Sequence, residues 1–466
     1  MRLIFLILFS INILSEPWIN ISNSKHLENI NYLLKTCKGW NNSFISYPVS
    51  LGELNFSLEM LKDKNSNNTL CTKNIDLVSE HLTGKFIESK EVIFGFQLGS
   101  NDQYFQTKNE RYYSENNFYY SISDISSNFA YKFKIINFEK NNKNYFDESY
   151  ISYKYKNHIF TAGRINRWWS PSDNYSLILS NSARPSLGIE FKNYLPIIPK
   201  RKIFDFIGHV NYEFFVNKLE KQREIPNTLL FGNRVTFNPT NNFKFSLVRL
   251  AQFGGKDRPK DARTILKMLV GKDNTSSTLS FDEQPGNQLA GLDFIYSPNL
   301  NKKFKIFGQM VGEDEAGYFP SKKMSLFGFG YIFNDLNPIR LNVEHINTFN
   351  GIKNSSYNHS LYKSGLRHYG VPIGASIDAD SEALKVSFIT KFNDFNFNFS
   401  FSDVLLNKNN SQLNYWTKQS TDFNQYNFLV KYKYKKSYID IIYTYTDKKF
   451  NSFSKNNLFL NISVKI

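Results

Sequence analysis

From Val92 onward, hydrophobic and polar residues alternate with a period of two along most of the chain. In residues 395–401, Phe occupies every odd position and Asn or Ser every even one. Residues 426–434 and 439–445 repeat the alternation, mainly with Tyr, Phe, Val and Ile against Asn, Lys, Asp and Thr. Because successive side chains of a strand point to opposite faces, this pattern predicts strands with one apolar face and one polar face.

The alternation predicts 18 strands, several of them near the length of about ten residues that crosses a bilayer when tilted. We place these strands at 92–99, 117–124, 128–138, 149–156, 158–163, 187–193, 203–217, 229–238, 242–253, 288–296, 303–313, 325–334, 338–349, 382–392, 394–403, 425–434, 437–447 and 456–466.

The connectors between these strands alternate between short and long. The short ones lie near 125–127, 157, 239–241, 297–302, 335–337, 393 and 435–436, and the long ones near 100–116, 164–186, 254–287, 314–324, 350–381 and 404–424. In an antiparallel barrel this order places short turns at one mouth and long loops at the other, as in outer-membrane barrels. We therefore predict an all-β transmembrane barrel of about 18 antiparallel strands over residues 91–466. The alternative is a secreted soluble β-sandwich or propeller, and the final Ile466 departs from the aromatic residue that ends many outer-membrane barrels.

The N-terminus predicts export from the cytoplasm. Arg2, an apolar stretch over 3–14 and the small residue Ser15 form the pattern of a secretory signal peptide at residues 1–15. The alternative for this stretch is a buried apolar strand.

Residues 16–90 have helical rather than strand-like spacing of apolar residues and predict a small periplasmic helical domain. We expect helices over about 24–36, from Ser50, and over about 72–86, with Ser50 and Glu53 as a capping box. Cys37 would follow the first helix and Cys71 would precede the third. An exported pair of cysteines permits one disulfide, and two free buried thiols are the alternative.

Composition excludes two classes of protein. The 466 residues are 41% hydrophobic, and the mean hydropathy is −0.43, so a bundle of membrane-spanning helices is excluded. Phe, Trp and Tyr make up 17% of the chain, which is too rich in aromatic residues for a disordered protein.

The net charge of +16 admits two interpretations. Lys is spread along the whole chain, as a general Lys and Asn bias would produce. Because the positive charge is not concentrated into a groove or helix, we expect no nucleic-acid partner. An acidic polymer is the functional partner that this charge favours.

The long loops combine aromatic, amide and charged residues, the types that stack on sugar rings and bind hydroxyl or carboxylate groups. For the two adjacent Trp residues, packing or a membrane-interface belt is the alternative. The candidate polysaccharide-binding residues are Arg164, Arg167, Trp168, Trp169, Asn181, Arg184, Arg258, Lys272, Asp273, Asn274, Glu313, Asp314, Glu315, Tyr357, Asn358, His359, Tyr362 and Arg367. Residues 262–269 have helical spacing and predict a short helix over the barrel mouth.

Catalysis and metal binding have weaker support in the sequence. The acids at 313–315 could serve glycoside hydrolysis or bind Ca²⁺, or could pair with nearby cations. His359 and His368 lack the spacing of a metal site, and no nucleotide-binding, hydrolase or zinc motif is present. We therefore expect no enzyme activity, no cofactor and no metal.

Four loop segments resemble the capsule-assembly Wzi family of Gram-negative outer membranes. They are WW-x-P followed by SLILSNSARP at 168–185, GKDN with PGNQLAGLDF at 271–294, FGQMVGEDEAG with FPS at 307–321, and YNH-x-LY with PIG at 357–374. The helix opening YPVSLGEL at 47–54 is also similar to the family. One departure is Ser170-Pro171-Ser172, where the family usually has Gly-Pro-Gly.

The resemblance implies an 18-stranded outer-membrane barrel with a periplasmic helical bundle and long extracellular loops. It also implies a lectin-like protein that binds capsular polysaccharide, here an acidic one, and holds the capsule at the cell surface. We expect a monomer in contact with outer-membrane lipid. The competing functions are a porin-like diffusion channel, which a barrel of this width could form, and an outer-membrane hydrolase using the acids at 313–315.

Overall fold

A computed structural model describes residues 17–19, 30, 34, 37, 44–83, 90–99, 105–108, 111–126, 128–140, 143–260, 286–298, 304–316, 319–333, 339–449 and 454–466, without the side chains of 19, 80–83, 314–316 and 319–321. The predicted signal peptide at residues 1–15, most of the predicted helix at 24–36 and the predicted helix at 262–269 lie outside the described residues.

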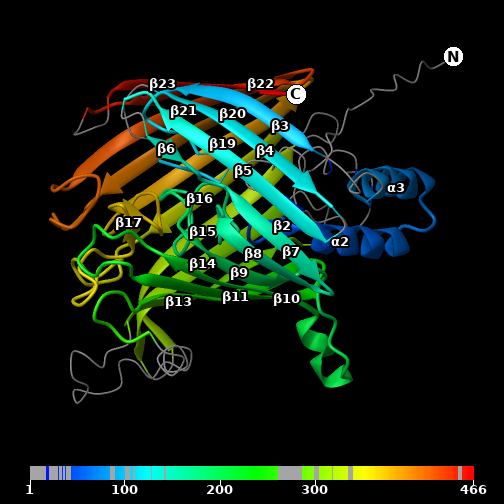
Figure 1. Cartoon of the computed structure of the whole chain (residues 1–466), viewed down its shortest axis with the longest axis horizontal. Helices are drawn as coiled ribbons and strands as arrows, with labels where there is room; N and C mark the ends of the chain where they lie inside the picture. Colours follow the sequence, from blue (N-terminus) through cyan, green and yellow to red (C-terminus); the bar gives the residue numbers. More distant parts are fainter. Residues whose placement is uncertain are drawn as a thin grey trace.

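Most of the described strands form one closed antiparallel barrel (Figure 1), and two short strand pairs, β1 Trp18–Ile19 with β2 Val49–Ser50 and β17 Arg367–His368 with β18 Val371–Pro372, lie outside it. Its strands are β3 Glu91–Leu98, β4 Asn117–Ile125, β5 Phe129–Phe138, β7 Tyr150–Tyr155, β8 His158–Arg164, β9 Leu187–Asn193, β10 His209–Lys218, β11 Leu229–Thr240, β12 Phe243–Phe253, β13 Gly286–Tyr296, β14 Phe304–Ala316, β15 Phe319–Phe333, β16 Ile339–Asn347, β19 Glu382–Phe392, β20 Phe395–Leu406, β21 Thr421–Tyr434, β22 Ser437–Thr446 and β23 Asn456–Lys465, with the two-residue β6 Asn144–Tyr145 beside β5.

Except at the closing seam, each wall strand pairs with the wall strands that come before and after it along the chain, and the barrel closes where β23 pairs with β3. At this seam Leu460 lies opposite Leu98 and Lys465 lies opposite Ile93. The predicted barrel of 18 antiparallel strands is therefore confirmed, and a sandwich or a propeller is excluded.

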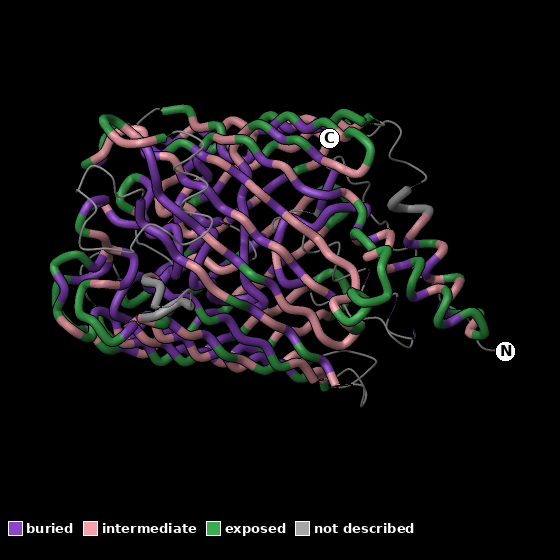
Figure 2. Tube along the Cα trace, turned by 90° about the horizontal axis from the view of Figure 1, so that it is seen from below, coloured by how far each residue is buried: buried purple, intermediate pink, exposed green. Residues whose placement is uncertain are grey.

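The two faces of the wall differ as the alternation predicts. In β22, Asp440, Thr444 and Thr446 are buried inside the barrel, whereas Tyr443 and Tyr445 are exposed on its outside. Figure 2 shows buried positions recurring along the crossing strands throughout the barrel. The apolar outer face is the surface that a barrel presents to lipid, and the inner face of this strand carries polar side chains into the lumen.

The two mouths of the barrel differ in their connections. We call the mouth that carries α2 and α3 the helix end and the opposite mouth, which carries the long connections, the loop end (Figure 1). At the helix end, most turns are as short as residues 156–157, 241–242, 393–394 and 435–436. The exception there is the longer segment 194–208.

Two sequence predictions about the connections between strands were wrong, one at each mouth. Residues 203–208 were assigned to a strand, but the 3₁₀ helix η2 Lys202–Ile207 occupies this region and ends at Gly208, whose φ of 65° suits glycine. Residues 314–324 were assigned to a long loop, but β14 and β15 continue into a hairpin in which Asp314 pairs with Ser321. Local apolar density does not distinguish a 3₁₀ helix from a strand.

The helical unit contains α2 Leu51–Lys64 and α3 Thr69–Thr83. The Ser50 half of the predicted capping box is confirmed, because Ser50 Oγ accepts a hydrogen bond of 3.0 Å from the Glu53 backbone N–H. Cys37 and Cys71 form a disulfide, and Cys71 lies within the first turn of α3 rather than before it. The short pair β1 Trp18–Ile19 and β2 Val49–Ser50 precedes α2.

The helical unit is attached to the barrel through backbone contacts. Tyr47 and Trp168 exchange two backbone hydrogen bonds, of 2.9 and 3.1 Å. Ser50 Oγ donates to the Tyr194 carbonyl at 2.6 Å. A Cβ at Gly52 would lie 2.3 Å from the same carbonyl oxygen, so glycine permits this close approach. The helices therefore form part of one folded body with the barrel.

Removing the disulfide tests how the helical unit is stabilised. The bridge joins residues 34 apart, and its loss is expected to cost about 3–4 kcal/mol on the chain-entropy model. We expect the Cys37→Ala/Cys71→Ala double variant to be cleaved faster by protease within residues 44–83. The barrel should keep its resistance to detergent unfolding, which serves as the internal control, and equal cleavage rates would contradict this assignment.

Candidate functional site

The β8–β9 loop, residues 165–186, folds back into the lumen instead of standing above the mouth. The Leu177 N–H donates to Gln309 Oε1 at 2.7 Å, and Gln309 Nε2 donates to the Trp169 carbonyl at 2.7 Å. Gln309 lies on β14, so one side chain of the inner wall binds the backbone of the loop at two positions, Trp169 and Leu177. Leu177 and Ile178 are fully buried there.

A second loop, residues 348–381 between β16 and β19, packs against the first inside the barrel. Tyr357 Oη donates to the Leu177 carbonyl at 2.7 Å, and the Ser180 N–H donates to the Ile373 carbonyl at 2.8 Å. Both loops contribute to one apolar cluster with inward-facing wall residues such as Phe307. A hydrophobic core therefore occupies the lumen.

The two adjacent tryptophans belong to different cores. Trp168 packs with the helical unit, whereas Trp169 packs in the luminal cluster against Phe215 at a ring distance of 5.3 Å. Both rings are 0% exposed, and Trp168 Nε1 donates to the Ser172 carbonyl at 2.8 Å. The structure therefore gives this pair a packing role that joins the helices to the barrel interior.

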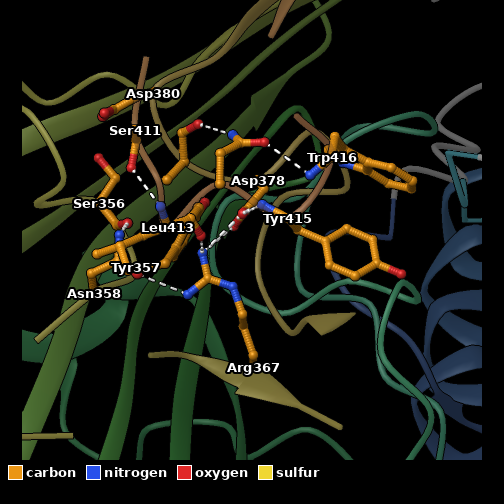
Figure 3. A network of polar contacts seen from close by, with 12 residues as sticks. Ser356, Tyr357, Asn358, Arg367, Asp378, Asp380, Ser411, Leu413, Tyr415 and Trp416 are labelled. Atoms are coloured by element: carbon orange, nitrogen blue, oxygen red, sulfur yellow. Dashed lines mark hydrogen bonds and ion pairs between the residues drawn. The ribbon is translucent and has the colours of Figure 1, made fainter. Parts of the chain in front are cut away.

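Arg367 connects three segments at the loop end (Figure 3). Its Nη2 lies 2.8 Å from Asp378 Oδ2, and its Nη1 donates to Asn358 Oδ1 at 2.8 Å. Nη2 also donates to the Leu413 carbonyl at 3.1 Å, and Asp378 Oδ2 accepts from the Tyr415 N–H at 2.7 Å. This buried pair thus ties the β16–β19 loop to the β20–β21 loop.

A buried His–Glu hydrogen bond continues the network toward the β10–β11 loop. His368 Nδ1 lies 2.6 Å from Glu220 Oε2, and Arg223 donates to the carbonyls of Arg367 and Gly365 at 3.0 Å each. Burial alone would raise the pKa of Glu220, but the hydrogen bond with His368 and the charge of Arg223 lower it. Glu220 is therefore held as a carboxylate.

Three further candidate residues also form internal pairs. Arg184 binds the carboxylate of Asp147 with two hydrogen bonds, of 2.8 and 2.9 Å. Asn181 Oδ1 accepts from Arg111 Nη2 at 3.0 Å. Arg167 Nε donates to Glu190 Oε2 at 2.8 Å.

Asp173 is the centre of a charged group inside the barrel. It forms an ion pair with Lys108, and Lys305 Nζ and Arg340 Nη1 lie 3.8 and 3.9 Å from its Oδ2. Burial opposes ionisation of this carboxyl, but the positive charges of Lys108, Lys305 and Arg340 hold its pKa well below the usual range. Neither Asp173 nor Lys108 was singled out in the sequence.

The acidic cluster does not present Glu313 as an available carboxylate. Its side chain accepts hydrogen bonds from the Tyr357 N–H, from Ser355 Oγ at 3.2 Å and from Asn350 Nδ2 at 3.3 Å. It therefore holds the start of the second luminal loop. Asp314 and Glu315 lie in β14, and their side chains lie outside the described part of the structure, as do Lys272, Asp273 and Asn274.

The remaining candidates lie at the loop end. Arg164 Nη1 donates to the Pro185 carbonyl at 3.2 Å, and His359 Nδ1 accepts from the Leu361 N–H at 3.1 Å. Tyr362 is buried and donates to the Gly254 carbonyl at 3.2 Å, while Arg258 is partly exposed nearby. Burial raises the pKa of the Tyr362 hydroxyl, although the charge of Arg258 opposes this shift.

One exposed aromatic residue of the loop end, Tyr369, was not singled out in the sequence. The two-residue strands β17 Arg367–His368 and β18 Val371–Pro372 form a hairpin whose turn is Tyr369-Gly370, with φ of 50° and 79°. Positive φ at both turn residues is the pattern of a tight hairpin turn. Tyr369 is 64% exposed, and its ring lies 4.6 Å from that of His368. In the sequence, the feature that indicates this hairpin is the Tyr369-Gly370 pair, because glycine readily adopts the positive φ that such a turn requires.

The loop end also carries exposed lysines. They occur on the β10–β11, β12–β13, β16–β19 and β20–β21 loops, at Lys221, Lys256, Lys363 and Lys408. Lys363 Nζ lies 3.9 Å from Glu224, and both side chains are exposed. Exposed positive charge and an exposed ring therefore lie at the same mouth, above loops whose buried polar residues bind one another.

A family model describes most of this chain. The model of the capsule assembly protein Wzi matches residues 98–457, which include nearly all of the barrel. This protein belongs to the Wzi capsule assembly family. The resemblance found in the four loop segments is therefore confirmed.

Two individual proteins are similar to this member of the Wzi family. The structure of Wzi from Escherichia coli, described as an outer-membrane, carbohydrate-binding β-barrel involved in group 1 capsule assembly, has a TM-score of 0.78 at 20% identity and covers 94% of this chain and 97% of that one. An uncharacterised 55.8 kDa protein of the Klebsiella pneumoniae cps region is 32% identical over 182 residues, which are 39% of this chain and 35% of that protein. The matched part thus spans about a third of that curated relative.

Two features are absent from the described residues. Their His, Cys, Asp and Glu side chains do not form a group of three that could hold a metal ion. No helix among them is both long enough and apolar enough to cross a membrane.

Neutralising Arg367 tests whether the buried pair holds the loops. In Arg367→Met, Asp378 becomes a buried carboxylate without its cation, at an expected cost of about 3–5 kcal/mol. We expect a lower unfolding temperature and faster protease cleavage within residues 407–420. Lys363→Met is the matched control, because its pair with Glu224 is exposed and should change stability by less than about 1 kcal/mol. Equal behaviour of the two variants would contradict the assignment.

Proposed function

We propose that this Wzi-family barrel is an outer-membrane lectin that binds capsular polysaccharide and retains the capsule on the cell surface. In this arrangement, the helix end with its disulfide lies in the periplasm and the loop end faces outward. Short turns at one mouth and long, structured loops at the other support this orientation. The carbohydrate binding attributed to E. coli Wzi provides the analogy for the ligand.

The observation that supports a binding surface best is the exposed Tyr369 ring on a short, fixed hairpin. An aromatic ring presented in this way can stack on a sugar face without losing much conformational freedom. The exposed lysines Lys221, Lys256 and Lys363 would attract an acidic polymer. Arg367, Asp378 and Glu220 would act below this surface as a support that keeps the hairpin in place.

Many of the candidate residues predicted from the sequence would contribute to binding indirectly, by holding the loops that carry the exposed surface. Trp169 and Tyr357 are buried in the luminal cluster, Trp168 is buried against the helical unit, and Arg367 is buried between the loops, so these side chains position neighbouring segments. Direct contact with sugar is proposed for exposed groups, with Tyr369 as the first. Arg258 and Asn358, which are partly exposed, are further candidates for direct contact.

Glycan binding by a Tyr369 variant tests this proposal. Capsular polysaccharide from the producing strain should bind the intact protein, and Tyr369→Ala should weaken binding about tenfold, which corresponds to about 1.4 kcal/mol. Calorimetry or surface plasmon resonance measures the change. Tyr434→Ala is the matched control, because Tyr434 is 55% exposed but lies in the wall strand β21 at the helix end.

Salt dependence in the same assay distinguishes an acidic ligand from a neutral one. Attraction between exposed lysines and an acidic polymer is screened by salt, so binding should weaken as ionic strength rises. Absence of binding by the intact protein would reject the proposed function. Binding that is unaffected by Tyr369→Ala would reject the proposed surface alone.

The competing channel function makes a different prediction. The two luminal loops and the helical unit lie across the interior, so planar-bilayer recordings should show no large, steady openings. The chain has no catalytic role in this proposal, and the capsular polysaccharide should keep its chain length during incubation with the protein. Steady conductance would favour a diffusion channel, and shortening of the glycan would favour a hydrolase.

A further inference from the structure

Among the fully described connections at the helix end, the longest is residues 194–208 between β9 and β10. It contains η2 and projects beyond the barrel wall, where Figure 1 shows it in green near the helices. Ile203 and Phe206 are 73% and 74% exposed, and further exposed apolar side chains of this segment are Leu195, Ile197, Ile198 and Phe204. An apolar surface of this kind outside a binding site usually marks contact with another surface.

The base of this segment is firmly bound to the wall. Ile197 and Val210 exchange two backbone hydrogen bonds of 2.8 Å. The Leu195 N–H donates to Asn157 Oδ1 at 2.7 Å, in the turn between β7 and β8. Gly208 packs so closely on β11 that an added Cβ would lie 1.8 Å from the Asn238 carbonyl oxygen. The apolar tip is therefore held in a fixed direction.

The segment lies beside outward-facing aromatic residues of the barrel wall. Phe191 and Tyr212 point outward on β9 and β10 with ring centroids 5.5 Å apart, and Phe237 stacks on Phe245 at 4.9 Å on β11 and β12. A ring of aromatic residues near a mouth is the feature by which barrels mark the membrane interface. The apolar tip extends outward from this aromatic ring.

The charges of the segment agree with a lipid headgroup layer. Lys200, Arg201 and Lys202 are consecutive and exposed, and they directly precede the apolar residues of η2. Apolar side chains beside a basic cluster are typical of segments that lie in the interface of an anionic membrane. Asp205 is the one acidic residue of η2.

We propose that residues 194–208 form an interfacial anchor that inserts into the lipid leaflet surrounding the helix end. Ile203, Phe204 and Phe206 enter the boundary between headgroups and acyl chains, and the basic cluster 200–202 binds anionic lipid phosphates. The occupant of this surface is phospholipid, not a protein. This inference rests on the proposed membrane placement of the barrel, so the experiment below separates the two.

Spin labels measure the depth of the segment directly. Single cysteines replace Phe206 in the tip, Phe399 on the outer wall of β20 and Asp394 in a short turn at the helix end, while Cys37 and Cys71 remain paired. The labelled proteins are reconstituted into vesicles of phosphatidylcholine with phosphatidylglycerol. Collision with oxygen reports the apolar phase, and collision with a soluble nickel chelate reports water.

We expect the label at 206 to resemble the label at 399, with oxygen access severalfold above nickel access, and the label at 394 to be reached by nickel. A lipid-exposed label at 399 with a water-exposed label at 206 would overturn the anchor and leave a protein partner as the occupant. A water-exposed label at 399 would instead reject the membrane placement of the barrel itself.

A charge variant tests the role of the basic cluster. Lys200→Gln/Arg201→Gln/Lys202→Gln should reduce the immersion of the label at 206 in vesicles with phosphatidylglycerol. The reduction should be much smaller in phosphatidylcholine alone. Lys221→Gln/Lys256→Gln/Lys363→Gln removes equal charge at the loop end and should leave the label unchanged. Equal immersion in both variants would reject the electrostatic part of the anchor.

Discussion

The width of the barrel is the constraint on which the rest of this structure depends. A wall of 18 strands encloses more space than its own inward side chains fill, and in porins of this size the remainder is water. Here, loops from one mouth and the helical unit at the other meet inside, at the backbone bonds between Tyr47 and Trp168. Polar groups buried in this way need partners, because an unpaired one costs as much as the packing contributes. The ion pairs of Arg367 with Asp378 and of Arg234 with Asp293 at 2.9 Å meet that need.

The wall could be predicted from the sequence because its cause is local. Alternation with a period of two follows from the geometry of a strand between lipid and a polar interior, and it identified every strand of the barrel. The errors occurred where other forces act. Residues 203–208 are apolar without being in the wall, and the hairpin of β14 and β15 extends beyond its apolar stretch to Asp314 and Ser321.

The site could be predicted only as a set of residue types. Arg, Asn, Tyr and Trp suit a sugar, but they also suit loops buried in a polar lumen, and the sequence does not distinguish these uses. The difference lies in partners that are distant along the chain, such as Asp147 for Arg184 and Glu190 for Arg167. Tyr369 was missed because its importance comes from exposure on a two-residue turn, which residue type does not reveal.

The seam between β23 and β3 joins the last strand of the chain to the first strand of the wall. Residues 456–465 pair with β22 on one side and with β3 on the other, so this strand covers the edges of both. The helical unit and both luminal loops precede that strand in the sequence. Because the wall is one meander whose two ends meet at this seam, it can close around its contents without any loop being threaded through a finished cylinder.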